Sequence, residues 1–362
     1  MKKVLSVLLG LVLCLSLMAC GSSADNAAAP ETAPSTSAAD SQTPQSTVGG
    51  DDFSDIKPVK IKFAHGYAGG ELAVELVEEW MDLVTEKTGG AVEWEYYSGG
   101  SLGSITEIIE QTDLGAVDLT VTDTSQLQNY AEEYAILFYP FLFQSYEHQL
   151  KTLESDIMDK FSAALEENSN LHALGYYVNG VRNICSKKQL ASLEDCKGVI
   201  LRVPEIQVYK DTATLLGMVP TTISYSEMYT AFNSGICEAV ECPNNSLYPS
   251  GYHKVGPYIL KAGHMFSSCA VEFNKDFWNQ LDPQVQAVLQ ESFDSLTAAH
   301  AEKVIAADEE FYKLYEEEGA TVSEWADAQA PADASKDYWY TSAEALGGDS
   351  KDIVDAIVAL RI

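Results

Sequence analysis

The chain is poor in positive charge. It has 22 lysine and arginine residues against 54 aspartate and glutamate residues, which gives a formal net charge of −32 at pH 7. Nucleic-acid binding needs a basic surface, so this composition argues against a nucleic-acid partner. Such acidity is typical of a surface kept soluble by its charge, and any anion site must therefore be built from locally placed cations.

The usual motifs of metal and nucleotide chemistry are also missing from the sequence. The six histidines are scattered, with no His-Glu-x-x-His pair. Cys237 and Cys242 have no second pair of ligands at zinc spacing. There is no Walker-type loop and no dinucleotide fingerprint. We therefore expect no metal and no cofactor.

Long apolar runs are absent except at the N-terminus, which reads MKKVLSVLLGLVLCLSLMAC. Two lysines, a short apolar run and small residues are the pattern of a secretory signal peptide, and the run is too short and wrongly flanked to span a membrane. Its end, Leu-Met-Ala-Cys, matches the bacterial lipobox and predicts a lipid on Cys20. An ordinary signal peptide with a chance cysteine is the alternative. Acyl chains would anchor the protein, since each buried methylene contributes about 0.8 kcal/mol.

The segment after Cys20 has almost no large apolar side chains. Residues 21–52 consist mainly of serine, alanine, threonine and proline. This composition predicts a disordered tether that holds a folded body away from a membrane.

From Pro58 onward, predicted strands alternate with predicted helices. The segment VKIKFAH reads as a strand, and an amphipathic helix pattern follows it and ends at two glycines. This alternation predicts an α/β fold with mostly parallel sheets covered by helices on both faces. Further helices are expected, among them one over 146–169, a very long one over 283–319, and a last one from about residue 343.

Five cysteines follow Cys20, and this odd number leaves at least one unpaired. An export signal permits disulfides, and sequence proximity makes Cys185–Cys196 and Cys237–Cys242 candidates. Buried free thiols are the alternative. The five are Cys185, Cys196, Cys237, Cys242 and Cys269.

The pentapeptide GGSLG at 99–103 fits the Gly-x-Ser-x-Gly pattern, with a predicted strand before it and a predicted helix after it. A serine esterase would use Ser101 as its nucleophile, with aspartate and histidine partners later in the chain. The sequence has no His-Gly-Gly oxyanion segment. Ser101 could equally lie in a turn that precedes a helix.

Two arginines, Arg182 and Arg202, lie in short apolar stretches that read as buried strands. An arginine in such a place must be paired. Its partner could be a carboxylate of the fold itself. It could also be a ligand carboxylate, held through two parallel hydrogen bonds by the planar guanidinium.

The segments around these arginines occur in a characteristic order. Through them the chain, from about Val59 to Ala320, resembles the solute-binding proteins of TRAP (tripartite ATP-independent periplasmic) transporters, the DctP family. The segments are IKFAH, VTEKTGGAVEWEYYSGGSLG, LGAVDLTVTD, YPFLFQSYEH, LGYYVNGVRNI, SLEDCKGVILRVP, LGMVPTTISYSEMYTAFNSGICEAVE and NKDFWNQL.

The resemblance implies a two-lobed, periplasmic-binding-protein-like fold, with strands that cross the hinge and a long helix that braces both lobes. Lobe I would hold residues 57–179 and about 268–305, and lobe II would hold 180–267 and about 306–362. The signal peptide would be 1–19, and the lipidated cysteine with its tether 20–56. A ligand would lie between the lobes, which would close by a hinge motion.

The resemblance also implies site residues. Arg202, in the pattern Gly-x-x-x-Arg-Val-Pro, would clamp the ligand carboxylate, and Arg182 would be a second cation. Tyr225 would lie over the ligand, although an aromatic residue at a helix start often only packs in the core. The family usually has asparagine where this chain has Cys242, so the chain departs from the pattern there. The other expected ligand-binding residues are His65, Tyr67, Ser104, Asp123, Asn179 and Asn245.

The function implied by the resemblance is capture, not catalysis. A monomer, held to the membrane by its lipid, would bind a small organic acid outside the cytoplasmic membrane and deliver it to a permease driven by an ion gradient. C4-dicarboxylates, keto acids, sugar acids and aromatic acids all stay open as ligands. The alternatives are the binding protein of an ATP-driven importer, the Ser101 esterase and a cell-surface adhesin.

Overall fold

The computed structural model describes Phe53 and residues 56–361, so the predicted signal peptide, Cys20 and nearly all of the tether lie outside the described residues. Nine strands of the described chain form one mixed sheet, in the order β2-β1-β3-β8-β4-β7-β5-β6, with β9 paired to β8. The strands are β1 (Val59–Ala64), β2 (Val92–Tyr97), β3 (Leu119–Asp123), β4 (Leu171–Ser186), β5 (Ile200–Val203), β6 (Val219–Thr222), β7 (Ala239–Pro243), β8 (Tyr258–Asn274) and β9 (Thr321–Glu324).

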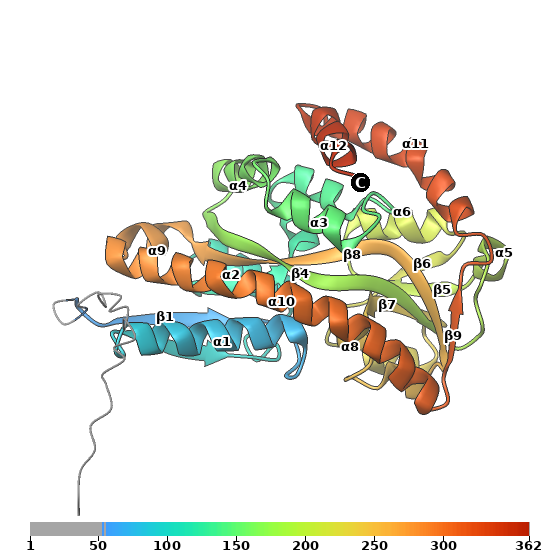
Figure 1. The fold of residues 1–362 in the computed structure, drawn as a ribbon, viewed down its shortest axis with the longest axis horizontal. Helices are drawn as coiled ribbons and strands as arrows, with labels where there is room; N and C mark the ends of the chain where they lie inside the picture. Colours follow the sequence, from blue (N-terminus) through green and yellow to red (C-terminus); the bar gives the residue numbers. More distant parts are fainter. Residues whose placement is uncertain (1–52, 54–55, 362) are drawn as a thin grey trace, which may run out of the picture. The chain divides into compact units, whose positions relative to one another are not determined.

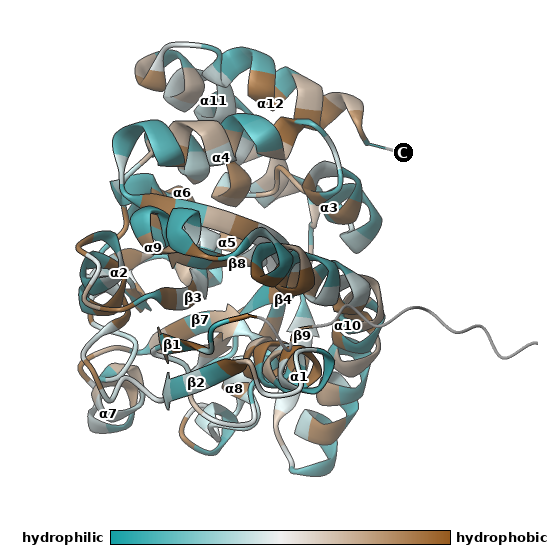
Figure 2. Cartoon of the chain, turned by 90° about the vertical axis from the view of Figure 1, so that its left-hand side faces the viewer, coloured by the Kyte–Doolittle hydropathy of each residue, from teal (hydrophilic) through white to brown (hydrophobic). Residues whose placement is uncertain are grey.

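The α-helices cover this sheet. In both Figure 1 and Figure 2, helices α3, α4, α11 and α12 lie on one side of the long strands, and α1 and α8 lie on the other. The helices are α1 (Leu72–Lys87), α2 (Ile105–Asp113), α3 (Tyr146–Leu153), α4 (Ile157–Asn168), α5 (Leu193–Cys196), α6 (Gln207–Leu215), α7 (Met228–Ser234), α8 (Asn244–Leu247), α9 (Lys275–Gln280), α10 (Pro283–Glu317), α11 (Gln329–Leu346) and α12 (Ser350–Ala359).

The sheet is parallel at its flanks and antiparallel at its centre. β1 pairs in parallel with β2 and β3, and β5 pairs in parallel with β6 and β7. The pairs β3–β8, β8–β4 and β4–β7 are antiparallel. The prediction of mostly parallel sheets is therefore correct for the two flanks and wrong for the centre.

Two long strands, β4 and β8, join the flanks. Their pairing runs from Leu171↔Asn274 to Ser186↔Tyr258. β8 pairs with β3 of the first flank at one end, and β4 pairs with β7 of the second flank at the other. These are the hinge-crossing strands of a two-lobed fold (Figure 1). The residue boundaries of the two lobes stay a prediction.

The long helix α10 contributes to the cores on both sides. Near its start, Phe293 packs edge-on against Trp80 at a centroid distance of 6.2 Å. Near its end, Tyr315 packs against Tyr248 at 5.2 Å, in the core that holds Phe232. At 1.5 Å per residue, its 35 residues span about 52 Å. The expected bracing helix is confirmed.

Two of the expected helices are each divided in two. The segment 146–169 breaks between α3 and α4, where Ser155 Oγ donates to the carbonyl oxygen of Thr152 and so competes with helix hydrogen bonds. The last expected helix starts earlier and forms α11 and α12. Gly347 and Gly348 separate them with φ angles of 76° and 53°, values that favour glycine.

All five cysteines of the described chain are buried free thiols, so the suggested pairs Cys185–Cys196 and Cys237–Cys242 are wrong. Of the two alternatives left open by the sequence, the structure shows the unpaired one.

Candidate ligand-binding site

A cavity of about 830 Å³ lies between the two flanks of the sheet. It sits beyond the carboxyl ends of parallel strands, where open α/β sheets bind ligands. β3 ends at Asp123 and β7 at Pro243, while Arg202 is next to the last residue of β5. Eight of the ten expected site residues line the cavity: Tyr67, Ser104, Asp123, Asn179, Arg182, Arg202, Tyr225 and Cys242.

Arg182 is held by carboxylates of the fold itself. Its Nε donates to Glu241 Oε2 at 2.6 Å, and Nη2 donates to Glu241 Oε1 at 2.9 Å. Nη1 lies 3.4 Å from Asp123 Oδ2. Burial alone would raise the pKa of Glu241, but the Arg182 guanidinium overrides it and lowers that pKa to about 2. The carboxylate partners of Arg182 therefore come from the chain itself.

Arg202 has no such partner. Its side chain is almost completely buried, and its Nε donates to the carbonyl oxygen of Ile223 at 2.8 Å. Within the described chain, no carboxylate oxygen lies within 4 Å of its nitrogens. A buried guanidinium that lines a cavity and lacks a counter-ion in the fold is suited to take one from a ligand.

Tyr225 lies between the flanks. It is half-buried, and its ring meets that of Tyr67 edge-on at a centroid distance of 6.1 Å. Its hydroxyl donates to Glu71 Oε1 at 2.9 Å and to Oε2 at 3.0 Å. The ring therefore forms a wall of the cavity and is fixed in place from the other flank.

Glu71 is a residue that the sequence reading missed. It is the N-cap of α1, is 1% exposed, and also accepts from the Ala68 amide at 2.9 Å and from Ser246 Oγ at 2.5 Å. Burial raises the pKa of this carboxyl group. A single acidic residue after two glycines at a helix start was the only local signal for it.

His65 and Asn245 do not line the cavity, although they were expected in the site. His65 is fully buried; its Nδ1 accepts from the Tyr67 amide at 3.2 Å, so Nε2 donates to Tyr96 Oη at 2.6 Å. Asn245 Nδ2 donates to the carbonyl oxygen of Asn179 at 2.5 Å. His65 therefore helps to position Tyr67, and Asn245 helps to position Asn179.

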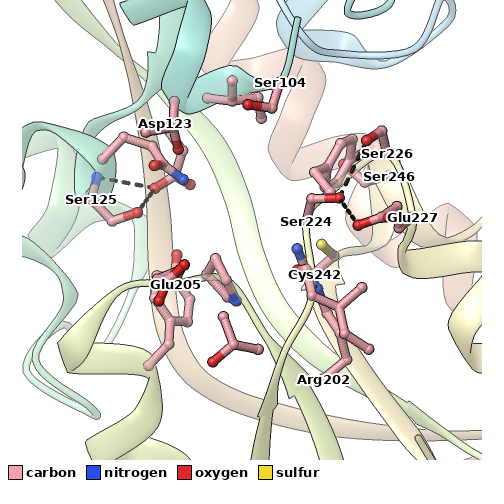
Figure 3. Close-up of a pocket in the computed structure, with 18 of the residues that line it drawn as sticks. Ser104, Asp123, Ser125, Arg202, Glu205, Ser224, Ser226, Glu227, Cys242 and Ser246 are labelled. Atoms are coloured by element: carbon pink, nitrogen blue, oxygen red, sulfur yellow. Dashed lines mark hydrogen bonds between the residues drawn. The ribbon is translucent and has the colours of Figure 1, made fainter. Parts of the chain in front are cut away.

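Asp123 and Ser104 lie on the first flank. Asp123 accepts from the amide and hydroxyl of Ser125 and from Ser267 Oγ, besides facing Arg182. Figure 3 shows Asp123 and Ser125 across the cavity from Arg202 and Cys242. Ser104 caps α2, with its hydroxyl accepting from the Glu107 amide. Cys242 Sγ lies 3.6 Å from Arg182 Nη2.

The model of one protein family, described as bacterial extracellular solute-binding protein, family 7, matches residues 63–345. The chain belongs to this family.

Named relatives support this assignment of the family 7 protein. It is 28% identical to a solute-binding protein of Roseobacter denitrificans over 60% of this chain and 66% of the relative. It is 27% identical to a C4-dicarboxylate-binding protein of Bacillus subtilis over 66% of this chain and 68% of the relative. A TRAP periplasmic solute-binding protein from Bradyrhizobium, solved with galacturonate, shares 26% identity with a TM-score of 0.78 and covers 83% of this chain and 100% of its own.

Ser101, the nucleophile of the esterase alternative, does not line the cavity of the family 7 protein. Ser101 lies exposed in a turn, where its amide donates to the carbonyl oxygen of Ser98. That turn leads into the capping box of α2.

Among the described residues, no three histidine, cysteine, aspartate or glutamate side chains are arranged to hold a metal ion. No helix in this part of the chain is long and apolar enough to cross a membrane.

Proposed function

We propose that this family 7 protein captures an organic acid between its two lobes, with Arg202 as the carboxylate clamp. The observation that carries the proposal is the buried Arg202 guanidinium, which lines the cavity and has no carboxylate partner in the described chain. Relatives that bind a C4-dicarboxylate and galacturonate support a carboxylate ligand. Lobe I would comprise 57–179 and about 268–305, and lobe II 180–267 and about 306–362.

Delivery completes the proposed role. The protein would be exported, carry a lipid on Cys20, and work as a monomer outside the cytoplasmic membrane. It would pass its ligand to a TRAP permease driven by an ion gradient. The TRAP assignment of the Bradyrhizobium structure supports this partner over an ATP-driven importer.

A thermal-shift screen against organic acids tests the binding role. A ligand at 100 times its Kd should raise stability by about 2.7 kcal/mol. Arg202→Ala should weaken binding of that acid by about 2–5 kcal/mol, as when one partner of a buried charge pair is removed. Arg202→Lys should restore binding only in part, because lysine lacks the planar fork. Equal shifts for wild type and Arg202→Ala would show that Arg202 is structural.

A further inference from the structure

Only one of the two arginines in the cavity is open to a ligand carboxylate. Arg182 donates to Glu241 through two nitrogens and faces Asp123 through a third, so one guanidinium already serves two carboxyl groups. A ligand carboxylate beside Arg182 would have to share it with both. Arg202 carries no such load, because no carboxylate of the described chain lies within 4 Å of it.

The rest of the lining adds negative charge. Glu107 comes from the first flank, and Glu205 and Glu227 come from the second; all three are exposed at the cavity. Glu107 Oε2 accepts from the Ser104 amide, and Glu227 Oε2 accepts from Ser224 Oγ. The second oxygen of each of these two carboxylates is an acceptor that a ligand hydroxyl can satisfy and a ligand carboxylate cannot.

Hydroxyl groups supply much of the remaining polar lining. Serines and threonines come from both flanks, and a hydroxyl can donate to or accept from a ligand hydroxyl. Figure 3 places Ser125 across the cavity from Arg202, so a ligand that spans this distance meets hydroxyl and carboxylate groups at its far end. These side chains are Ser104, Ser125, Thr222, Ser224, Ser226 and Thr230.

We propose that the ligand carries a single carboxylate, held by Arg202, on a hydroxyl-bearing carbon chain, and that the site rejects acids with a second carboxylate. This inference rests on the proposed function, because it concerns the ligand of the same cavity. It follows from the number of charges: one unpartnered guanidinium accommodates one carboxylate, and the other charged groups of the lining are either carboxylates or, in the case of Arg182, already paired.

Matched pairs of acids test this directly. Each pair shares one carbon skeleton, and a terminal CH₂OH in one member is a carboxylate in the other: gluconate with glucarate, galactonate with galactarate, and glycerate with tartronate. Calorimetric titration of the full-length protein should give its tightest binding with a monocarboxylate. The matched dicarboxylate should bind about 100-fold more weakly, because like charges placed together are strongly unfavourable.

A variant tests the cause. Glu241→Gln removes the carboxylate that occupies Arg182. The ratio of the dissociation constants of a dicarboxylate and its matched monocarboxylate should therefore fall by about tenfold. Asp123→Asn offers a second route to the same result if the first variant does not fold. Glu324→Gln is the control, because this exposed residue on β9 pairs with Lys261 and lies outside the cavity lining. This control variant should leave the ratio of the two dissociation constants unchanged.

The outcomes separate the two proposals. If the dicarboxylate binds as tightly as its partner, or more tightly, while Arg202→Ala abolishes binding, the single-carboxylate inference is wrong and the capture function stands. If no organic acid binds, both the proposed function and the single-carboxylate inference are wrong. If the ratio of the two dissociation constants is unchanged in both Glu241→Gln and Asp123→Asn, the pairing of Arg182 with carboxylates of the fold does not set the selectivity.

Discussion

The hydroxyl of Tyr225 donates to both carboxylate oxygens of Glu71, at 2.9 and 3.0 Å, although the two residues lie 154 positions apart. Glu71 starts α1 beside the first flank of the sheet, and Tyr225 follows β6 in the second. The aromatic wall of the cavity is therefore oriented by a buried acid from the opposite side.

Glu71→Gln should weaken ligand binding about fivefold, since it removes one strong acceptor from Tyr225 and a typical hydrogen bond contributes about 1 kcal/mol. Thermal stability without ligand should not fall, because burial already disfavours the charged form of Glu71. Titration calorimetry and thermal unfolding check the two effects separately. A loss of stability without a loss of affinity would make Glu71 purely structural.

Tyr225→Phe should weaken binding to a similar degree. Because both changes break the same contact, combining it with Glu71→Gln should add little. Additive losses in this double-mutant cycle, measured by calorimetry, would contradict a shared role.

Replacing each of the two arginines should change stability to a very different extent in the absence of ligand. Arg182→Ala leaves the buried Glu241 carboxylate without its guanidinium partner, with His264 Nε2 still 3.4 Å from Oε2, and should lower the free energy of unfolding by about 3–5 kcal/mol. Arg202→Ala removes no partner from a carboxylate and should change that free energy much less. Urea unfolding measures both. Adding Glu241→Gln to Arg182→Ala should recover part of the loss, and no recovery would mean that the Arg182 effect is packing alone.

Acid should destabilise the fold through its buried histidines. Burial lowers the pKa of His65 and of His300 from 6.5 to about 4. Between these values the folded protein binds fewer protons than the unfolded chain, so stability falls as pH falls, by at most about 3 kcal/mol for each histidine. His65→Asn keeps an acceptor for the Tyr67 amide and should flatten the dependence of unfolding free energy on pH. Parallel curves for variant and wild type from pH 7 to pH 4 would contradict this.

Glu272 should oppose the effect of the histidines, because its own contribution to stability is larger in mild acid than at pH 8. It is fully buried on β8, and neither carboxylate oxygen has a partner among the described residues. Burial raises its pKa well above 4.5, so the folded state holds an extra proton above that pH and stability falls as pH rises. Glu272→Met should stabilise the protein by about 1–3 kcal/mol at pH 8, with a smaller gain near pH 4.5. Urea unfolding at the two pH values measures this, and a loss of stability at pH 8 would indicate a hidden partner for the acid.

The sequence predicted the parallel flanks and the long helix because their apolar patterns are regular. It did not reveal β8, since the buried polar residues His264, Ser267 and Glu272 interrupt the strand's apolar pattern. Composition could not separate Arg182 from Arg202, because each lies in a similar apolar stretch. Only the pairing of β4 with β7 places Glu241 beside Arg182 and leaves Arg202 without such a partner.

Burial in the folded state protects the five thiols of the described chain from oxidation. Burial raises the pKa of each of these five thiols, so almost none of them is a reactive thiolate while the described part of the chain is folded. Each unfolding event in an oxidising compartment outside the cytoplasm would expose these five nucleophiles, and mispaired bridges could then block the return to the native state. The working lifetime of the protein would then be set by its unfolding rate, and a reducing agent should make heat denaturation reversible.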